Sequence, residues 1–404
     1  MIEIAILGFG VVGGGTVNLL ESHKESIKQK IGEEVHVKYI LDIRDMPDSP
    51  YADRLTKDYS VILSDPEVKI VAELIGGSHP AFEFSMSALK AGKHVVTSNK
   101  EVVANFGDEL LATAAANGVQ YLFEASVGGG VPIIRPLTTD LAANDIRSIS
   151  GIVNGTTNYI LYRMLEGGID FDTALAEAKA KGYAEADPSA DVEGLDACRK
   201  ICILTAVTYG KLVPPASVHT EGITNIRPED VRAAALFDSD IKLLARAVRD
   251  GNGDLFMMVA PFFVSRSCPL AHVSDVFNGI MVSGSAVGDV MFYGRGAGAL
   301  PTASAVCSDI LSLAHKDTPA TLTFERDEHF AADFSFFSSR HYLALTGIDE
   351  NAARVILGDV TVLSGIGEEL LLVTEETSEN ALDDARRRLE SCGAKVVSHI
   401  RVFA

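Results

Sequence analysis

The chain has 404 residues, of which 47% are hydrophobic and 22% are charged, and its formal net charge is -20. This length predicts two or three globular domains with ample core material. The acidic balance argues against nucleic acid as a partner, since phosphate binding needs clustered Lys and Arg, and no apolar run reaches the roughly 18 residues of a membrane span.

A glycine motif follows the first predicted strand, residues 3–7, and leads into a helix. In this context the first glycine permits a tight turn, the second lets a pyrophosphate approach the backbone, and the third allows close packing of helix on strand. The helix N-terminus then offers N–H groups to the phosphates. We therefore predict a dinucleotide-binding site formed by Gly8, Phe9, Gly10, Val11, Val12 and Gly13.

The second predicted strand, residues 35–43, ends beside two residues that bear on cofactor choice. An acid here, such as Asp42, would hold a ribose 2'-hydroxyl and favour NAD, whereas Arg44 would hold the 2'-phosphate of NADP. Because the sequence has both, NAD and NADP stay open at this stage.

Strand and helix patterns then alternate over residues 70–75, 81–89, 94–97, 102–116 and 119–123. This alternation predicts a doubly wound parallel sheet, in which ligands gather at the carboxyl ends of the strands. Gly77 and Lys100 both follow such strand ends, so we expect them near the cofactor.

From residue 146 the pattern changes to that of a separate α+β domain. A strand at 149–153 precedes the stretch 154–159, where Asn154 and Thr156 either cap a helix or hold a polar substrate. Helices are expected at 172–181 and around Asp196, followed by strands at 255–264 and a glycine-interrupted hairpin within 279–293.

The stretch 182–200 carries five carboxylates ahead of an apolar run. We expect Ser189 or Asp191 to cap the following helix, on which Asp196 and Lys200 share one face. The core of that helix is predicted from its apolar residues Leu195, Ile201, Ile203 and Leu204. The alternative is a solvated acidic loop followed by one surface ion pair.

A glycine-rich segment, 294–298, should approach the cofactor and lead into a helix that returns to the first domain. Residues 317–334 are polar and linker-like, and the tail has a βαββαβ order typical of a small ferredoxin-like module. The expected domains are 1–135 with the helix 300–316, then 136–299, then 335–404. The five cysteines form no CxxC pair, and the first strand leaves no room for a signal peptide, so we expect a reduced, cytoplasmic protein with Cys198 and Cys202 in the core.

Several motifs together resemble one family, homoserine dehydrogenase. They are GFGVVG at 8–13, TSNK at 97–100, EASVGGGVP at 124–132, NGTTNYIL at 154–161, AEADPSADVEGLDACRK at 184–200 and GRGAGALPTASA at 294–305. The resemblance covers residues 1 to about 315. The tail resembles the ACT regulatory domain of that family, and the chain resembles its monofunctional form rather than the aspartokinase fusion.

The resemblance implies an NAD(P)-dependent interconversion of L-homoserine and L-aspartate 4-semialdehyde, in threonine, isoleucine and methionine biosynthesis. A homodimer or higher homo-oligomer is the family expectation. By motif position, the implied catalytic residues are Lys200, Lys100 and Asp196. The implied substrate ligands are Glu185, Asp191, Asp196, Asn154, Thr156 and Tyr183. Further cofactor contacts are implied at Gly182 and Gly298. A sodium ion is implied at Glu124 with the carbonyls of Val127, Gly129 and Val131.

The chemistry of the residues fits this expectation. An unperturbed lysine, with a pKa of about 10.4, is a poor base at neutral pH. Burial or a second cation such as Lys100 would lower the pKa of Lys200, while Asp196 would oppose that shift. Other readings are a different Rossmann dehydrogenase, or a catalytically idle sensor of NAD(P) and an amino acid. In the tail, the ACT-type turn at 349–352 carries Ala352 where a glycine is expected, so the tail serves either effector binding or dimerisation.

Overall fold

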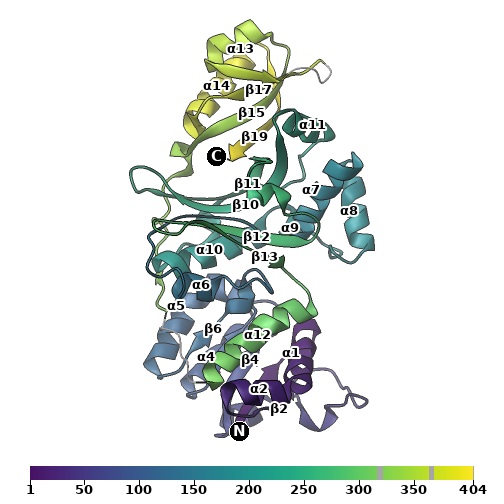
Figure 1. Cartoon of the computed structure of the whole chain (residues 1–404), viewed down its shortest axis with the longest axis vertical. Helices are drawn as coiled ribbons and strands as arrows, with labels where there is room; N and C mark the ends of the chain where they lie inside the picture. Colours follow the sequence, from purple (N-terminus) through teal and green to yellow (C-terminus); the bar gives the residue numbers. More distant parts are fainter. Residues whose placement is uncertain (316–321, 364–367, 404) are drawn as a thin grey trace.

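The computed structural model describes residues 1–315, 322–363 and 368–403. Along its longest axis it has an N-terminal α/β part at one end and the C-terminal tail at the other, and an eleven-stranded sheet runs from the middle of the molecule into the tail (Figure 1). Among these described residues, no helix is both long and apolar enough to cross a membrane.

The N-terminal part is a parallel six-stranded sheet in the order β3-β2-β1-β4-β5-β6. This is the strand order of a Rossmann fold. The strands are β1 (Ile2–Leu7), β2 (Val35–Leu41), β3 (Leu55–Thr56), β4 (Val68–Glu73), β5 (His94–Thr97) and β6 (Tyr121–Leu122). The helices are α1 (Val11–Ser22), α2 (Lys24–Ile31), α3 (Tyr59–Ser64), α4 (Ala81–Lys90) and α5 (Lys100–Ala116). The predicted doubly wound sheet is confirmed. The second strand ends earlier than predicted, at Leu41, because Asp42 turns back to accept the N–H of Phe9.

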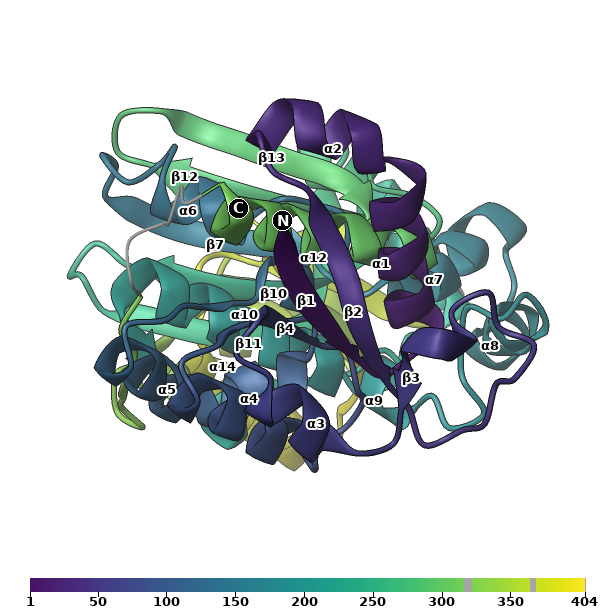
Figure 2. The same ribbon diagram turned by 90° about the horizontal axis from the view of Figure 1, so that it is seen from below.

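A late helix, α12 (Ala299–Ala314), completes this part of the molecule. It packs beside α1, where a side chain on Gly15 would lie 3.0 Å from the carbonyl oxygen of Ala299. Figure 2 shows α12 next to α1 when the molecule is viewed from below. The helix therefore packs against the Rossmann part, and its predicted last residue, 316, lies outside the described residues.

The middle of the molecule is a mixed sheet in the order β13-β12-β7-β10-β11-β19-β15-β17-β16. Its first five strands are β7 (Ile146–Ile152), β10 (Ser239–Arg249), β11 (Leu255–Ser265), β12 (Phe277–Gly284) and β13 (Gly288–Arg295). The accompanying helices are α6 (Ile134–Thr138), α7 (Gly155–Gly167), α8 (Phe171–Ala180), α9 (Ser189–Val192), α10 (Leu195–Tyr209) and α11 (Pro228–Leu236). The predicted hairpin is β12–β13. Neither β10 nor α11 was predicted.

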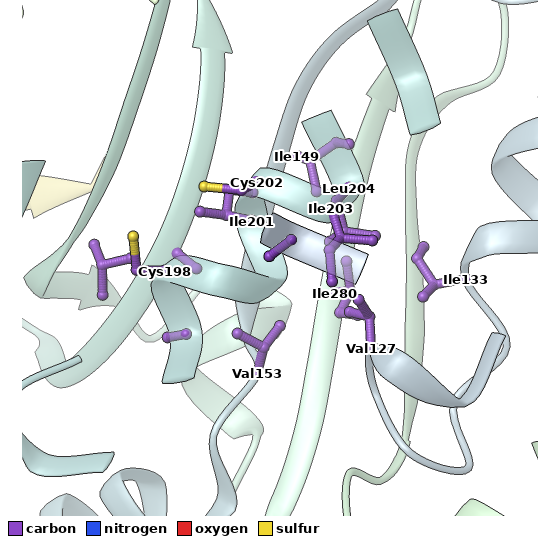
Figure 3. Close-up of a cluster of buried hydrophobic side chains, with 14 of the residues drawn as sticks. Val127, Ile133, Ile149, Val153, Cys198, Ile201, Cys202, Ile203, Leu204 and Ile280 are labelled. Atoms are coloured by element: carbon purple, nitrogen blue, oxygen red, sulfur yellow. The ribbon is translucent and has the colours of Figure 1, made fainter. Parts of the chain in front are cut away.

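The helix α10 forms the centre of the core (Figure 3). Cys198, Cys202 and Ile203 are buried on it, as predicted, in the same cluster as Val127 and Ile280. Two expectations for this helix were wrong. Leu195 is 46% exposed, because it stands at the first turn before the helix enters the core. The helix is preceded by Gly194 at a φ of 81°, and Ser189 instead begins the separate short helix α9.

The tail comprises β15 (Ser338–Thr346), α13 (Glu350–Leu357), β16 (Val360–Leu363), β17 (Leu370–Thr374), β18 (Thr377–Ser378), α14 (Glu379–Ser391) and β19 (Lys395–Phe403). Its four longer strands are antiparallel and arranged β19-β15-β17-β16. The last strand, β19, also pairs in parallel with β11, so the tail continues the central sheet. Residue 364, predicted as the end of a strand, lies outside the described residues.

The segment before the tail was predicted as a linker, and its residues 317–321 lie outside the described residues. The part that is described contains a two-residue strand, β14 (Glu325–Arg326), which pairs with β8 (Lys211–Leu212). It therefore contributes to the fold instead of only joining two domains.

Candidate active site

One cavity of about 440 Å³ lies where α5 of the Rossmann part meets the middle of the molecule. It gathers ten of the residues predicted from sequence. They are Lys100, Asn154, Thr156, Gly182, Tyr183, Glu185, Asp191, Asp196, Lys200 and Gly298. These residues come from four separate stretches of the chain. The fold therefore brings together side chains that lie far apart in the sequence.

A single carboxylate in this cavity pairs with two lysines. Asp196 lies 2.6 Å from Lys200 Nζ through Oδ2, and 2.5 Å from Lys100 Nζ through Oδ1. Lys200 Nζ also donates to the carbonyl oxygen of Val153 at 2.6 Å. The Lys200–Asp196 pair is within α10, as its four-residue spacing predicts, whereas Lys100 reaches it from the Rossmann part.

The start of α5 fixes the position of Lys100. Asn99 caps the helix by accepting the N–H of Val102, which satisfies one of its free donors. The Asn99 amide also donates to the carbonyls of Ile75 and Gly77, so the strand ends hold this helix start in place. Lys100 therefore stands at the carboxyl edge of the parallel sheet, as predicted.

Burial and charge set the protonation of the two buried partners. Burial lowers the pKa of Lys200, Asp196 opposes that shift, and the second cation, Lys100, adds to it. This is the balance expected from sequence. Burial alone would raise the pKa of Asp196, but the charges of Lys200 and Lys100 outweigh it and hold that pKa well below its usual value. Asp196 is thus ionised, and Lys200 gives up its proton more readily than an exposed lysine.

Asn154 joins the acidic side chains of the cavity. Its Nδ2 donates to Asp191 at 2.6 Å and to Asp196 at 2.9 Å, while its Oδ1 caps α7 by accepting from Thr157. Both alternatives predicted for this segment, a helix cap and a polar lining of the cavity, therefore occur in one residue. Asp191 was also expected as a helix cap. Its carboxylate is instead bound by Asn154.

Asn154, Asp191 and Asp196 form one side of the cavity, the acidic wall, and two further segments complete it. Thr156 Oγ1 donates to the carbonyl oxygen of Tyr183 at 2.7 Å, which ties α7 to the acidic stretch. The ring of Tyr183 packs edge-on against Tyr159, with centroids 5.0 Å apart. Glu185 lines the same cavity with an exposed side chain. The wall therefore presents carboxylates, an amide and a hydroxyl to a small polar ligand.

The glycine motif has the backbone that a dinucleotide needs. Gly8 has a φ of 91°, and a side chain on Gly13 would lie 1.9 Å from the carbonyl oxygen of Gly8. A side chain on Gly10 would instead meet open space, which leaves room for a phosphate. Within the described part of the chain, no side chain caps α1. The first-turn N–H groups are therefore available to an anion, and the motif fits a pyrophosphate.

At the end of β2, Asp42 and Arg44 bind each other. Asp42 Oδ1 accepts the N–H and Nε of Arg44, and its Oδ2 accepts Nη2 of Arg44 and the N–H of Phe9, all at 2.9 Å. Arg44 Nη2 also donates to the carbonyl oxygen of Phe9, and 57% of the Arg44 side chain is exposed. Both carboxylate oxygens of Asp42 are thus engaged, and the guanidinium lies over the glycine motif.

The residues expected to bind sodium lie outside the cavity lining. Glu124 Oε1 accepts the N–H groups of Ile133 and Ile134, and its Oε2 accepts that of Arg135, so the carboxylate caps α6. One carboxylate and three carbonyls would suit a hard cation chemically. However, no cluster of three or more His, Cys, Asp or Glu side chains suited to a metal ion occurs among the residues described.

Two contributors to the cavity were missed by sequence reasoning. Val153 offers only its carbonyl oxygen, and Val276 lines the wall from the segment before β12. A backbone acceptor leaves no signal in residue type, so only the position of Val153 one residue before Asn154 could have drawn attention to it.

A Rossmann sheet with a lysine–carboxylate site at the carboxyl ends of its strands is the arrangement expected of a nicotinamide-dependent oxidoreductase. Two family models agree with this class. One, described as homoserine dehydrogenase, matches residues 132–311, and the other, described as homoserine dehydrogenase, NAD binding domain, matches residues 8–124. The chain belongs to the homoserine dehydrogenase family.

Individual relatives agree over most of the chain. A homoserine dehydrogenase from Synechocystis is 42% identical over 363 residues, covering 87% of this chain and 81% of the relative. The crystal structure of a homoserine dehydrogenase from Thiobacillus denitrificans matches with a TM-score of 0.91 and 36% identity, over 100% of this chain and 98% of that one. A hyperthermophilic archaeal homoserine dehydrogenase in complex with NADPH matches with a TM-score of 0.68 and 29% identity, over 79% of this chain and 99% of that one.

The chain is therefore an NAD(P)-dependent oxidoreductase of amino-acid biosynthesis that acts on a small molecule. None of these comparisons supports a catalytically idle sensor.

Proposed function

We propose that Lys200 is the proton acceptor and donor of the homoserine dehydrogenase reaction in this chain. The observation that carries this proposal is the pair of lysines on one buried carboxylate, Asp196. When L-homoserine is oxidised to L-aspartate 4-semialdehyde, a neutral Lys200 takes the proton of the hydroxyl, and in the reverse direction it returns that proton to the aldehyde oxygen. When bound, the nicotinamide supplies the hydride chemistry.

The acidic wall orients the substrate. Asp191 and Asp196, held together by Asn154, lie where they would bind the ammonium group of homoserine, and Glu185 adds a third carboxylate. Thr156 and Tyr183 complete the polar lining. Holding the substrate in place lowers the activation barrier, because the reacting groups are already aligned when the reaction begins. Lys100, between the sheet edge and Asp196, stands on the nicotinamide side of this arrangement.

The direct test follows nicotinamide absorbance with L-homoserine, once with NAD and once with NADP. Turnover with homoserine is the expected result. A protein that binds either cofactor but does not oxidise homoserine would contradict the reaction on which the proposed role of Lys200 depends, and would favour the sensor.

We further propose a preference for NADP. The cofactor would lie on residues 8–13, with Gly77, Gly182 and Gly298 near its nicotinamide half. Both oxygens of Asp42 are engaged, so a ribose hydroxyl finds no free carboxylate, whereas the exposed Arg44 suits a 2'-phosphate. The structure of an archaeal homoserine dehydrogenase similar to this chain is a complex with NADPH.

The test of this preference is Arg44→Gln. The variant should raise the KM for NADP about tenfold, since the 2'-phosphate contact is lost. It should not raise the KM for NAD, since loss of the guanidinium frees the Asp42 carboxylate for a ribose hydroxyl. Lys57→Gln, on the same surface and paired with Asp45, is the matched control. A wild type that prefers NAD would contradict the proposal.

For the rest of the chain we keep the expectations from sequence as proposals. The domains are 1–135 with 300–316, 136–299 and 335–404. The antiparallel order β19-β15-β17-β16, with α13 and α14, supports a ferredoxin-like, ACT-type tail in a monofunctional enzyme. In such a tail Asp349 caps α13, and threonine or another effector is the ligand to test.

A homodimer is proposed because β13 is an outermost strand of the central sheet. The five free cysteines support a reducing, cytoplasmic location, and the route to threonine and methionine follows from the family. A sodium ion at Glu124, Val127, Gly129 and Val131 would show as a melting temperature higher in sodium than in choline chloride.

A further inference from the structure

A second buried cluster of charges lies where the tail joins the central sheet. Arg401 of β19 is 2% exposed, and its Nε and Nη2 donate to the two oxygens of Glu379 at 2.6 and 2.8 Å. Its Nη1 donates to both oxygens of Glu221, at 2.9 and 3.0 Å. His219 Nε2 lies 2.6 Å from Glu221 as well. Glu221 is therefore bound from the tail side by a fully buried arginine.

The backbone around Glu221 presses against the turn that precedes α10. The N–H of Ile223 donates to the carbonyl oxygen of Val192 at 2.8 Å. A side chain on Gly222 would lie 2.2 Å from the same oxygen, and one on Gly194 would lie 3.2 Å from the carbonyl oxygen of Glu221. Residues 221–223 and 192–194 are thus packed backbone to backbone, without side chains between them.

That turn carries the acidic wall of the cavity. Asp191 directly precedes Val192, and Asp196 follows Gly194 by two residues. Both carboxylates are bound by the amide of Asn154 from α7. A displacement of the turn would therefore move the two acids relative to Asn154, and with them the place where a substrate ammonium group binds.

We propose that Glu221 is a positioning residue, which Arg401 of the tail holds in place and which in turn fixes the turn 192–194 and the substrate carboxylates Asp191 and Asp196. This inference rests on the proposed function, because it takes those two acids as substrate ligands. It predicts that the junction with the tail sets the affinity for homoserine. The glycine motif for the cofactor lies on the other sheet, so cofactor affinity should not respond.

The chain offers a matched control at the same junction. Arg227 at the start of α11 donates to both oxygens of Glu369 in the tail, at 2.9 and 3.1 Å. This pair also joins the middle of the molecule to the tail, but the other partner of Arg227 is Asp230, on the same helix. Breaking it loosens the tail without touching residues 191–196.

The experiment measures KM for L-homoserine, KM for the cofactor, kcat and melting temperature in wild type, Glu221→Gln, Arg401→Lys and Glu369→Gln. Glu221→Gln and Arg401→Lys should raise KM for homoserine about tenfold, because small displacements of positioning groups are costly. In both variants KM for the cofactor should change little. Glu369→Gln should leave KM for homoserine equal to that of wild type, because the Arg227–Glu369 pair does not contact residues 191–196.

Some outcomes of this experiment would overturn the inference. A folded Glu221→Gln variant with wild-type KM for homoserine would overturn the inference, and so would an equal rise in KM for Glu369→Gln. Should Arg401→Lys fail to fold, Glu221→Gln still decides, since it keeps the size and hydrogen-bonding shape of the side chain. Wild type without homoserine turnover would overturn the proposed function first, and this inference with it.

Discussion

Two clusters of three charged side chains, each centred on one buried charge, have opposite compositions in this molecule. In the cavity, Lys100 and Lys200 surround one carboxylate, Asp196. At the junction with the tail, Glu221 and Glu379 surround one guanidinium, Arg401. Both clusters join parts of the chain that lie far apart in sequence, so both hold the fold together.

The directions of the pKa shifts separate the two clusters. Burial would lower the pKa of Arg401, but its two carboxylates raise it. Burial would raise the pKa of Glu221, but His219 and Arg401 lower it to about 2. Both groups are therefore charged at neutral pH. In the cavity, by contrast, burial lowers the pKa of Lys200 toward neutrality. A surplus of cations leaves a proton available for exchange, whereas an arginine between two acids does not.

The largest effect should come from removing the exchangeable proton. Lys200→Met should lower kcat about a hundredfold or more, with cofactor binding intact, because general acid–base catalysis is lost. Lys242→Met is the matched control, since Lys242 is also buried and donates to a carbonyl, that of Val273, at 2.7 Å. Nicotinamide absorbance measures the rate and cofactor fluorescence the binding. Equal losses in the two variants would mean that any buried lysine matters only for the fold.

A smaller effect should appear in the pH dependence of homoserine oxidation, which requires neutral Lys200 and so rises with pH. Lys100→Met removes a like charge, so the pKa of Lys200 rises and the half-maximal pH of kcat moves up by about one unit. Asp196→Asn removes an opposite charge, so the half-maximal pH moves down. Rates at saturating substrate across the pH range test this. Shifts in the same direction in both variants would contradict Lys200 as the titrating group.

The smallest effect concerns stability at the junction with the tail. The folded pKa of Glu221, about 2, is below the value of about 4.3 for an unfolded glutamate. Its ionised form therefore stabilises the folded state above pH 4.3, and this contribution is lost as the pH falls toward 2. Urea unfolding of wild type and Glu221→Gln should show a stability gap that narrows over this range. A difference in the free energy of unfolding that widens on acidification would contradict a stabilising contribution from ionised Glu221.

The local patterns of the sequence predicted most of the Rossmann part, because several strands there contain a short apolar run, such as Ile4 to Leu7 in β1 and Ile70 to Ala72 in β4. They also placed Lys100 at the carboxyl edge of the sheet and Asp196 with Lys200 on one helix face, while the family resemblance implied that the three share one site. What they missed depends on contacts between distant segments. β10 was not predicted because Lys242 and Arg246 interrupt its apolar pattern. Their cost of burial is offset by the Val273 carbonyl and by the rings of Phe262 and Phe403.

The wrong helix cap has the same origin. Ser189 and Asp191 are residue types that favour caps, so a local rule selects them for the helix that follows. In the structure, Asn154, 37 residues earlier, binds Asp191, and the left-handed Gly194 begins α10. The preference of Ser189 and Asp191 for helix caps is a local property, whereas their actual contacts depend on partners from distant segments of the chain.

The pairing of β19 with β11 has a practical consequence for protein engineering. The last three residues of that ladder, Arg401 to Phe403, cover one side of β11 from Phe262 to Val264. Cutting the chain before the tail would leave this backbone edge open, and open apolar edges recruit other strands and cause aggregation. A truncated enzyme would then precipitate for reasons unrelated to regulation. Point substitutions in the tail are the safer way to learn whether it binds an effector.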